Sequence, residues 1–260
     1  MKRNKPTDIF IKAVILISMG FILSSCATVS PPTPVSQTPT DFIYKPFEGG
    51  PVMRQDIYHE IGPAETVYRI AKMYDVSIEQ ILKANGISDP KQLRIGQKLL
   101  IPQAAPIRPV IPVFKTNKWT YIVIHHSVTE SGDARTLDII HRRRGFDRGL
   151  GYDFVIDNGT DTRADGQIEA SPRWMKQMDG AHCDLGGMNE CGIGICLVGD
   201  FTHEPPTKEQ MDSLVLLVNT LRKYYHIPSS RIIRHKDVPG KRTQCPGNSF
   251  PWEEFKSRLR

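Results

Sequence analysis

The stretch that decides the fold reads Tyr121-Ile122-Val123-Ile124-His125-His126-Ser127. Its β-branched and aromatic residues lead directly into two imidazoles, which predicts a buried strand that delivers polar side chains to the edge of a sheet. The alternative is a strand that simply ends in polar loop residues. What favours a site is a pair of stretches far downstream, Arg234-His235-Lys236-Asp237 and Thr243-Gln244-Cys245-Pro246-Gly247.

Two histidines and one cysteine from these stretches form a plausible zinc site. Catalytic zinc takes three protein ligands and leaves its fourth position to water, and imidazole with thiolate suits the softness of Zn²⁺. We therefore predict His125, His235 and Cys245 as Zn²⁺ ligands and give His126 a supporting role. Because the two histidines lie far apart in the chain, their spacing alone leaves the zinc site open.

Length and composition allow more than one folded domain. The chain has 260 residues, of which 39% are hydrophobic and 24% charged, so it can bury a sizeable core. Its formal net charge of +6 is compatible with an anionic wall or membrane surface. The basic residues are scattered and no aromatic residues are interleaved with them, so we expect no nucleic-acid partner.

The N-terminus has the pattern of an export signal. Basic residues precede the apolar run Ala13–Leu23, which is too short for a membrane-spanning helix of about 20 residues. Leu23-Ser24-Ser25-Cys26 then resembles the lipobox of bacterial lipoproteins, in which the signal peptide (residues 1–25) is removed and Cys26 is acylated. The resemblance implies a lipid-anchored protein of the cell envelope, in the outer membrane and facing the periplasm because Ala27 follows the cysteine. The alternative is a plain signal peptide with an incidental cysteine.

Two proline-rich segments are expected to be extended connections. Residues 26–55 are dominated by Pro, Ser and Thr without an apolar period, which predicts a semi-rigid tether. In residues 103–118 prolines alternate with small and apolar residues, which predicts a stiff linker.

Residues 56–102 show the pattern of a small βααβ module. Val67, Ile70, Ala71 and Tyr74 share one helical face, and Ser77-x-x-Gln80 has the form of a capping box before a second helix. Asn85-Gly86 ends that helix, and Leu99-Leu100-Ile101 is a closing strand. Ala64 to Ala71, Asn85-Gly86-Ile87 and Ile95 to Pro102 resemble a LysM domain, which implies binding to the glycan strands of peptidoglycan. The LysM family usually has Gly-Asp where this chain has Ala64-Glu65, and that leaves its affinity open.

Residues 119–260 are predicted to form one α/β domain with a mixed central sheet flanked by helices. Further expected strands are Tyr152–Asp157, Gly192–Gly199 and Ile232–Ile233, and Asn158-Gly159 predicts a hairpin after the first of these. Helices are expected at Arg135–Arg144 and after the capping box Thr207-x-x-Gln210.

Six stretches of this domain, in order, resemble the type 2 N-acetylmuramoyl-L-alanine amidases, a family that includes the peptidoglycan recognition proteins. They are Ile122 to Ser127, Gly151 to Ile156, Gly180-Ala181-His182, Ile193 to Phe201, Arg234 to Asp237, and Thr243 to Gly247. The resemblance implies a zinc amidase that hydrolyses the lactyl–L-Ala amide of peptidoglycan. It also implies that His125, His235 and Cys245 are the zinc ligands.

The same resemblance implies roles for four further residues. Tyr152 corresponds to a tyrosine near the metal, and a phenol donor there suits a developing oxyanion. Thr243 stands where many relatives have Lys, as in the recognition-protein branch. His182 and Asn189 are expected to contact substrate. Another branch has a catalytic Glu where this chain has Cys196, so no such role is assigned. For Asp153, in place of a common His, the sequence offers no account.

Alternatives remain open at this stage. Cys183, Cys191 and Cys196 permit one disulfide, for which we favour Cys183–Cys191 because Cys196 lies in a strand. A non-catalytic peptidoglycan-binding lipoprotein would also fit, although such relatives lack the cysteine ligand that Cys245 supplies. A hydrolase of another wall amide, such as a recycling enzyme for anhydro-muropeptides, is disfavoured by the export signal and the LysM pattern.

Overall fold

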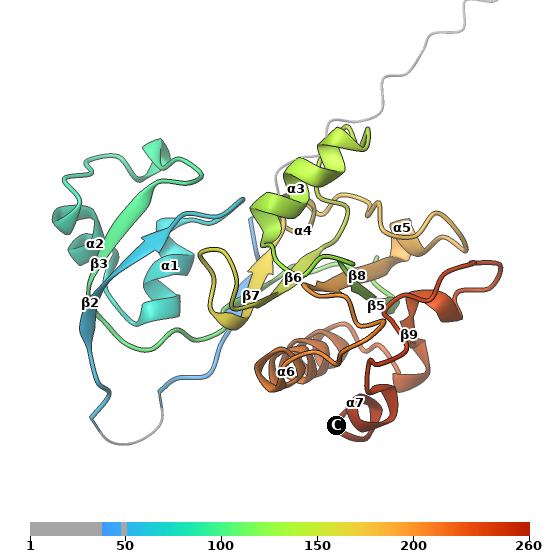
Figure 1. The fold of residues 1–260 in the computed structure, drawn as a ribbon. Coiled ribbons are helices and arrows are strands. Elements are labelled where there is room, and N and C mark those ends of the chain that lie inside the picture. Colours follow the sequence, from blue (N-terminus) through green and yellow to red (C-terminus); the bar gives the residue numbers. More distant parts are fainter. Residues whose placement is uncertain (1–37, 48–50) are drawn as a thin grey trace, which may run out of the picture. The chain divides into compact units, whose positions relative to one another are not determined.

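The computed structural model describes residues 38–47 and 51–260, which are shown in colour in Figure 1. The predicted signal peptide, the predicted lipid attachment at Cys26 and most of the predicted tether lie outside these residues. Within the described residues, every helix is too short or too polar to cross a membrane.

The large domain (residues 119–260) is built on a mixed five-stranded sheet with the order β7-β6-β8-β5-β9. Strand β5 runs parallel to both of its neighbours, β8 and β9, and β6 runs parallel to β8, the middle strand of the sheet. Only the edge strand β7 is antiparallel, paired with β6. The strands are β5 Tyr121–His126, β6 Phe154–Asn158, β7 Asp165–Ala170, β8 Gly192–Leu197 and β9 Ile232–Arg234. The predicted mixed sheet is thus confirmed.

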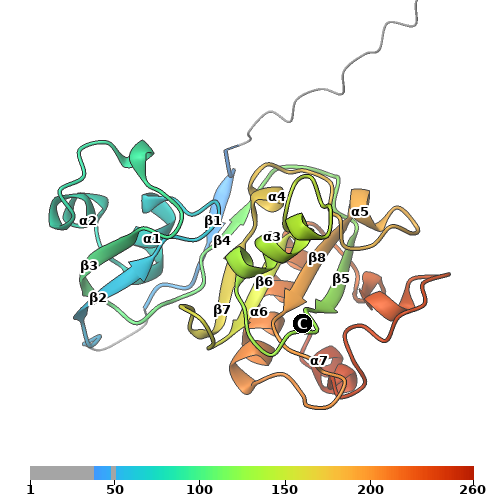
Figure 2. The ribbon, with the colours of Figure 1, turned by 45° about the horizontal axis from the view of Figure 1, so that its top comes forward.

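Helices cover both faces of this sheet (Figure 2). On one face α6 packs Leu214, Val218 and Leu221 against strand residues such as Ile124 and Ile195. On the other face α3 packs Ala134 and Leu137 against Val155 and Cys196. The predicted capping box of Thr207 and Gln210 begins α6. The helices are α3 Ala134–Arg143, α4 Pro172–Met175, α5 Met188–Cys191, α6 Lys208–Tyr224 and α7 Trp252–Ser257, with two short 3₁₀ turns at Ser229–Arg231 and His235–Asp237.

Strands β6 and β7 form the predicted hairpin, with one difference from the expectation. Asn158 pairs with Asp165, so the connection is longer than the two-residue turn that Asn-Gly signals. Gly159 still has a positive φ of 79°, which suits glycine, but Asn158 directs its side-chain amide to the Glu130 carbonyl and thereby belongs to the loop packing.

The small domain (residues 55–104) has the predicted βααβ order. Antiparallel strands β2 (Gln55–Glu60) and β3 (Lys98–Ala104) frame α1 (Val67–Tyr74), α2 (Ile78–Ala84) and a 3₁₀ turn at Pro90–Gln92. Its core contains the fully buried Ile70, Ile81, Leu99 and Ile101. The Ser77–Gln80 capping box begins α2, and Gly86 follows its end with a φ of 63°.

The structure corrects both predicted connections. Strand β1 (Asp41–Ile43), inside the predicted tether, pairs antiparallel with β4 (Ile111–Val113), inside the predicted linker. The reason is apolar content: residues between the prolines, among them Val110, Val113 and Phe114, are buried. Trp174 Nε1 of α4 also donates to the Pro112 carbonyl at 2.8 Å. Residues 105–110 therefore pack on the small domain, whose core includes Val110, and Ile111, Val113 and Phe114 join the core of the large domain.

Buried charges join the two domains in what we call the interdomain cluster: His59, Glu65, Arg69, Arg163 and Glu169. Glu65 Oε2 accepts hydrogen bonds from His59 Nε2 at 2.8 Å and from the Gly62 amide at 2.7 Å. Arg163 of the large domain lies 3.0 Å from Glu169 Oε2 and donates to the Glu60 carbonyl at 2.8 Å. From the small domain, Arg69 donates to the Ile168 carbonyl at 3.0 Å.

The pKa values of the two glutamates in this cluster are shifted in opposite directions. Burial alone would raise the pKa of Glu65, but His59 and the two arginines lower it to about 2. Burial raises the pKa of Glu169 to about 7 against the attraction of Arg163. Gly62 permits the close approach, because a Cβ there would lie 2.4 Å from Arg163 Nη2. The unusual Glu65 of the small domain is thus a component of its contact with the large domain.

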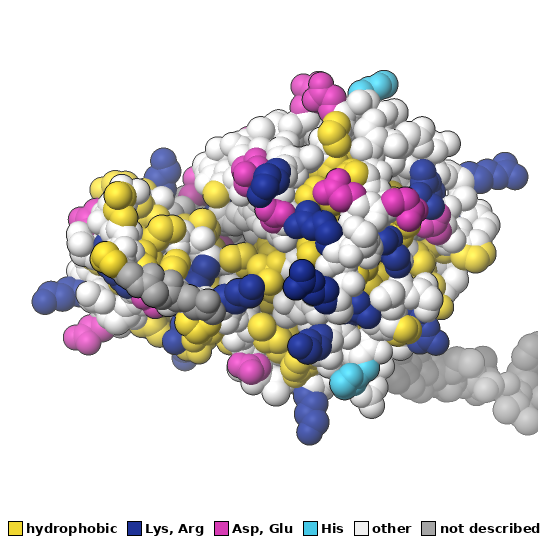
Figure 3. Space-filling model, turned by 90° about the horizontal axis from the view of Figure 1, so that it is seen from below, with side chains coloured by type: hydrophobic (Ala, Val, Ile, Leu, Met, Phe, Trp, Pro, Cys, Tyr) yellow, Lys and Arg dark blue, Asp and Glu magenta, His cyan; other side chains and the backbone are white. Residues whose placement is uncertain are grey.

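Basic side chains on the face shown in Figure 3 are interspersed with acidic and apolar ones. Several of the basic side chains follow one another down the middle of this face.

Candidate functional site

Three side chains that lie far apart in the sequence meet at one buried point of the large domain. The potential ligand atoms of His125, His235 and Cys245 all lie within 4.8 Å of one another. His125 Nδ1 is 3.7 Å from Cys245 Sγ, and the rings of His125 and His235 have their centroids 4.5 Å apart. The structure therefore brings together the three residues that the sequence analysis selects as zinc ligands.

The fold holds each of these side chains in a different way. His125 is the fifth residue of β5, a strand paired on one side with β8 and on the other with β9, and His125 itself lies opposite Cys196 of β8. His235 follows β9 directly, at the start of a 3₁₀ turn. Cys245 is tied to that turn because the Lys236 amide donates to the Cys245 carbonyl at 2.9 Å. Neighbouring parallel strands end at the same sheet edge, which explains the convergence.

The donor set fits a soft divalent cation. His235 Nε2 is buried without a hydrogen-bond partner, an exception among buried polar atoms that a metal ion would satisfy. Burial raises the pKa of the Cys245 thiol to about 12, while the His126 amide, which donates to Sγ at 3.4 Å, acts in the opposite direction. A bound cation reverses such a shift and favours the thiolate. Burial also lowers the pKa of His235 to about 4, which keeps its imidazole neutral and able to coordinate.

Tyr152 and Thr243 border this point. The Tyr152 ring lies 5.1 Å from the His125 ring and is also stacked near His141. Burial and the nearby Cys196 thiol raise the pKa of Tyr152 well above its ordinary value, so the phenol keeps its proton. Thr243 Oγ1 accepts a hydrogen bond from the Cys245 amide at 3.1 Å, which leaves the hydroxyl proton available to another acceptor.

His182 and Asn189 are placed differently from the expected substrate contacts. His182 is 8% exposed, and both ring nitrogens are engaged, with His125 Nε2 and with the Gly192 carbonyl, each at 3.1 Å. The Oδ1 atom of Asn189 accepts from the amides of His182 and Cys183. Both side chains therefore organise the loop behind His125. The sequence could not indicate this role, because only the fold places Gly192 beside His182.

His126 points to the opposite face of the sheet from His125, as alternation along a strand requires. Its Nδ1 accepts a hydrogen bond from the Phe201 amide at 3.1 Å, and its ring lies over Phe201. Its own backbone amide contacts Cys245 Sγ. The predicted supporting role agrees with this placement.

The structure explains the presence of Asp153, which the sequence left unexplained. Its carboxyl is fully buried, and Oδ2 accepts from the Gly194 amide of β8 at 2.8 Å. Burial raises the pKa of Asp153 to about 7, and Oδ1 has no hydrogen-bond partner. The residue fastens β8 to the segment before β6 and takes no part in the metal site.

The expected disulfide is not formed, since Cys183, Cys191, Cys196 and Cys245 are all free thiols. Cys183 is buried with Sγ toward the Leu185 carbonyl, whereas Cys191 Sγ contacts the Gly187 carbonyl at 3.1 Å. The two side chains thus have separate local partners, Cys183 in the loop before α5 and Cys191 at the end of α5.

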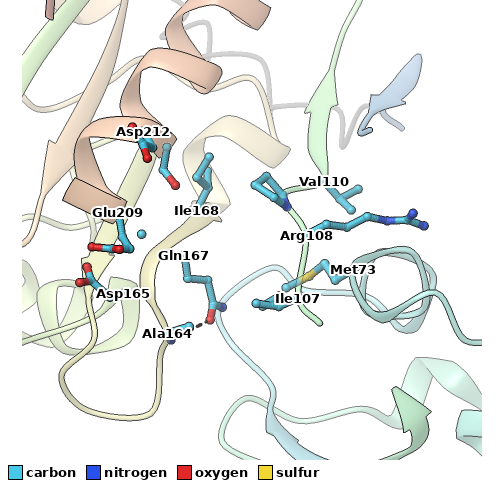
Figure 4. A pocket seen from close by; sticks show the side chains of 13 residues that line it. Met73, Ile107, Arg108, Val110, Ala164, Asp165, Gln167, Ile168, Glu209 and Asp212 are labelled. Atoms are coloured by element: carbon cyan, nitrogen blue, oxygen red, sulfur yellow. Dashed lines mark hydrogen bonds between the residues drawn. The ribbon is translucent and has the colours of Figure 1, made fainter. Parts of the chain in front are cut away.

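A cavity of about 230 Å³ lies at the junction of the two domains, away from these residues (Figure 4). Arg108, Met73 and Ile107 border one side, and acidic residues including Glu209 and Asp212 border the other. None of the predicted ligands or their neighbours lines it, so we attribute the function to the histidine and cysteine site.

Comparison with known families agrees with this site. The sequence pattern of the family described as N-acetylmuramoyl-L-alanine amidase matches residues 115–248, about half of the chain. The chain belongs to the N-acetylmuramoyl-L-alanine amidase family. The pattern of the LysM domain matches residues 59–102, so the small domain is a LysM domain and the large domain is the amidase-family domain.

Individual relatives include proteins of insects and bacteria. Peptidoglycan-recognition protein 2 of Holotrichia diomphalia is 30% identical over 135 residues, which cover 46% of this chain and 66% of that protein. The 1,6-anhydro-N-acetylmuramyl-L-alanine amidase AmpD of Haemophilus influenzae is 38% identical over 73 residues, 28% of this chain and 39% of the relative. Among solved structures, the endolysin N-acetylmuramoyl-L-alanine amidase LysCS of Clostridium intestinale is 38% identical, covers 55% of this chain and 84% of its own, and has a TM-score of 0.47.

The chain spans between 39% and 71% of the length of these curated relatives. The part that matches the amidase family, residues 115–248, contains all three candidate ligands.

Proposed function

We propose that this chain is a zinc-dependent N-acetylmuramoyl-L-alanine amidase acting on peptidoglycan. Its substrate is the amide between the lactyl group of N-acetylmuramic acid and L-alanine. The observation that carries the proposal is the convergence of His125, His235 and Cys245 at one buried point beside Tyr152. A bound Zn²⁺ would supply a Lewis acid and lower the pKa of a water molecule to about 7.

Two side chains of the large domain are suited to hydrogen-bond the oxyanion that develops on the amide oxygen. Tyr152 offers its phenol proton at Oη, which burial retains by raising its pKa. Thr243 offers its hydroxyl proton, because its oxygen already accepts from the Cys245 amide. Preorganised donors of this kind commonly lower a barrier by about 3–4 kcal/mol each.

Proton transfer is not assigned to Cys196. Burial and the nearby Cys245 raise its pKa well above the ordinary value, so it remains a neutral thiol. Hydrolysis breaks the C–N bond, forms a C–O bond from water to the lactyl carbonyl carbon, and releases the L-alanine amine with one added proton.

We propose that two further parts of the chain bring this site to its substrate. The LysM domain binds the glycan strand, while the amidase-family domain holds the stem peptide. Acylation of Cys26 after removal of residues 1–25 anchors the protein to the outer membrane facing the periplasm. The support for the anchor is the N-terminal sequence pattern, and labelling with a radioactive fatty acid in cells, with Cys26→Ala as control, tests it.

Digestion of purified sacculi tests the catalytic proposal. The wild type is incubated with and without a chelator, and products are identified by mass spectrometry. We expect intact glycan strands and free stem peptides with an L-alanine N-terminus, both lost with chelator. His235→Ala and Cys245→Ala should abolish bound zinc and product, whereas His203→Ala, which changes an exposed histidine, should retain both.

Sedimentation with sacculi separates catalysis from binding. The inactive variants should still cosediment, since the LysM domain is unchanged. Full release of stem peptides by a protein shown by elemental analysis to lack zinc would refute the zinc mechanism. Cosedimentation of the zinc-loaded wild type without any release would instead favour a peptidoglycan-binding protein.

A further inference from the structure

His182 stands directly behind the candidate ligand His125. Its Nδ1 is 3.1 Å from His125 Nε2, and its own Nε2 is 3.1 Å from the Gly192 carbonyl oxygen. The two rings meet edge to face, with centroids 5.0 Å apart and planes at 75°. Both imidazoles are buried, with an exposed fraction of 8% for His182 and 1% for His125.

The Gly192 carbonyl sets the direction of both hydrogen bonds. A carbonyl oxygen can only accept, so His182 Nε2 carries a proton and donates it to Gly192. In the neutral ring Nδ1 of His182 is then an acceptor, and His125 Nε2 must be the donor to it. The lone pair of His125 therefore lies on Nδ1, the atom that faces Cys245 Sγ at 3.7 Å.

The surrounding backbone leaves one position for the His182 ring. A Cβ at Gly194 would lie 2.4 Å from Cδ2 of His182, and a Cβ at Gly180 would lie 2.5 Å from the same atom. From the loop side, Asn189 Oδ1 accepts from the His182 amide at 2.9 Å. Two glycines from different segments thus make a slot that fits an imidazole in this orientation.

Other roles for His182 do not fit this arrangement. Because both of its ring nitrogens are already hydrogen-bonded, it has none left for a metal ion or a substrate amide. We propose that His182 is a positioning residue that holds His125 in the tautomer with a free lone pair on Nδ1, ready to bind the metal. This inference rests on the proposed zinc function, since partners that fix a ligand tautomer matter only where the ligand binds a metal.

Zinc affinity of the full chain, measured by competition with a chromophoric chelator in the absence of substrate, tests this role. His182→Phe keeps a ring of similar size in the slot but removes the acceptor, and we expect it to lower the affinity about 10- to 100-fold. His182→Gln can accept from His125 and donate to Gly192, so it should restore most of that loss. His203→Ala serves as an exposed control.

Nitrogen-15 NMR of histidine rings in the wild type gives a readout that needs no variant to fold. We expect His125 and His182 both to show the Nε2–H tautomer in the zinc-free protein. A proton on Nδ1 of His182, equal zinc affinity of His182→Phe and the wild type, or equal loss in the Phe and Gln variants would each overturn the proposal. Failure of the wild type to bind zinc would refute the proposed function itself.

Discussion

Replacing Arg163 by Met tests whether the interdomain cluster holds the LysM domain against the large domain. The Arg163 guanidinium lies 3.0 Å from Glu169 and also near the buried Glu65, and its side chain is 2% exposed. Met fills a similar length without charge. Removing one partner of a buried ion pair costs about 3–5 kcal/mol, because an uncompensated charge stays in the interior. We therefore expect Arg163→Met to lower the free energy of unfolding by that amount.

The stability lost in Arg163→Met should change with pH, and the direction of this change follows from the pKa values of Glu65 and Glu169. Glu65 has a folded-state pKa of about 2, below its ordinary 4.5, so it stabilises the fold above about pH 4.5 and loses that contribution as the pH falls toward 2. Part of this contribution depends on Arg163. Glu169 has a folded-state pKa of about 7, so its ionised form is the costly one, and losing Arg163 raises that cost at neutral pH. The stability lost in the variant should consequently be largest near neutral pH, shrink as Glu169 takes up a proton below about pH 7, and keep the part that depends on Glu65 until the pH falls from about 4.5 toward 2.

Urea unfolding followed by circular dichroism measures both effects, and Arg135→Met is the matched control. Arg135 also joins the two domains, through Glu60 at 2.7 Å, but its side chain is 47% exposed. Exposed ion pairs contribute about 0–1 kcal/mol. Because both variants remove one arginine at the same contact, they differ mainly in burial. Equal unfolding free energies for the two variants at neutral pH would refute the reasoning.

Three further predictions concern the large domain. Tyr152→Phe should lower kcat about 100-fold with zinc content unchanged, measured by peptide release and elemental analysis, because it removes one oxyanion donor. Asp153→Asn should flatten the pH dependence of stability in urea titrations. In the wild type the Asp153 carboxyl has a pKa of about 7 in the folded state and an ordinary pKa of 3.8, so it takes up a proton on folding. The free energy of unfolding of the wild type therefore falls by at most about 1.4 kcal/mol per pH unit as the pH rises from about 4 to about 7. Chelation should raise hydrogen exchange in residues 235–245 and leave β5 protected, since β5 is paired with a neighbouring strand on each side.

Much of the fold and of the candidate site could be predicted from local sequence patterns. The strand before His125 and the two capping boxes were readable because each depends on residues close together in the chain. The ligand set followed from residue type, from the positions after strands and from a family resemblance. Such signals are short in range, and they place elements without showing what packs on them.

What the sequence could not indicate depends on contacts between distant segments. The segment with Val110 and Val113 appeared to be a linker, because proline content does not show that Val110 joins the core of the small domain and Val113 that of the large domain. Glu65 appeared to be a departure from the LysM pattern, and only the approach of Arg163 at Gly62 explains it. His182 likewise required Gly192 and Gly194 to be beside it, an arrangement set by the sheet.

The way the three ligands are held argues for a catalytic site over a structural one. One ligand, His125, lies on a strand bonded on both sides, and the other two lie on a segment that the Lys236 amide closes at 2.9 Å. Because backbone contacts gather the ligand atoms, we expect the large domain to fold without a metal ion, unlike small zinc domains that unfold without it. Structural zinc sites are closed by four protein ligands, whereas catalytic sites use three and leave one position open. Within the described residues the candidate metal-binding group has three members, and the proposed donors Tyr152 and Thr243 lie beside it.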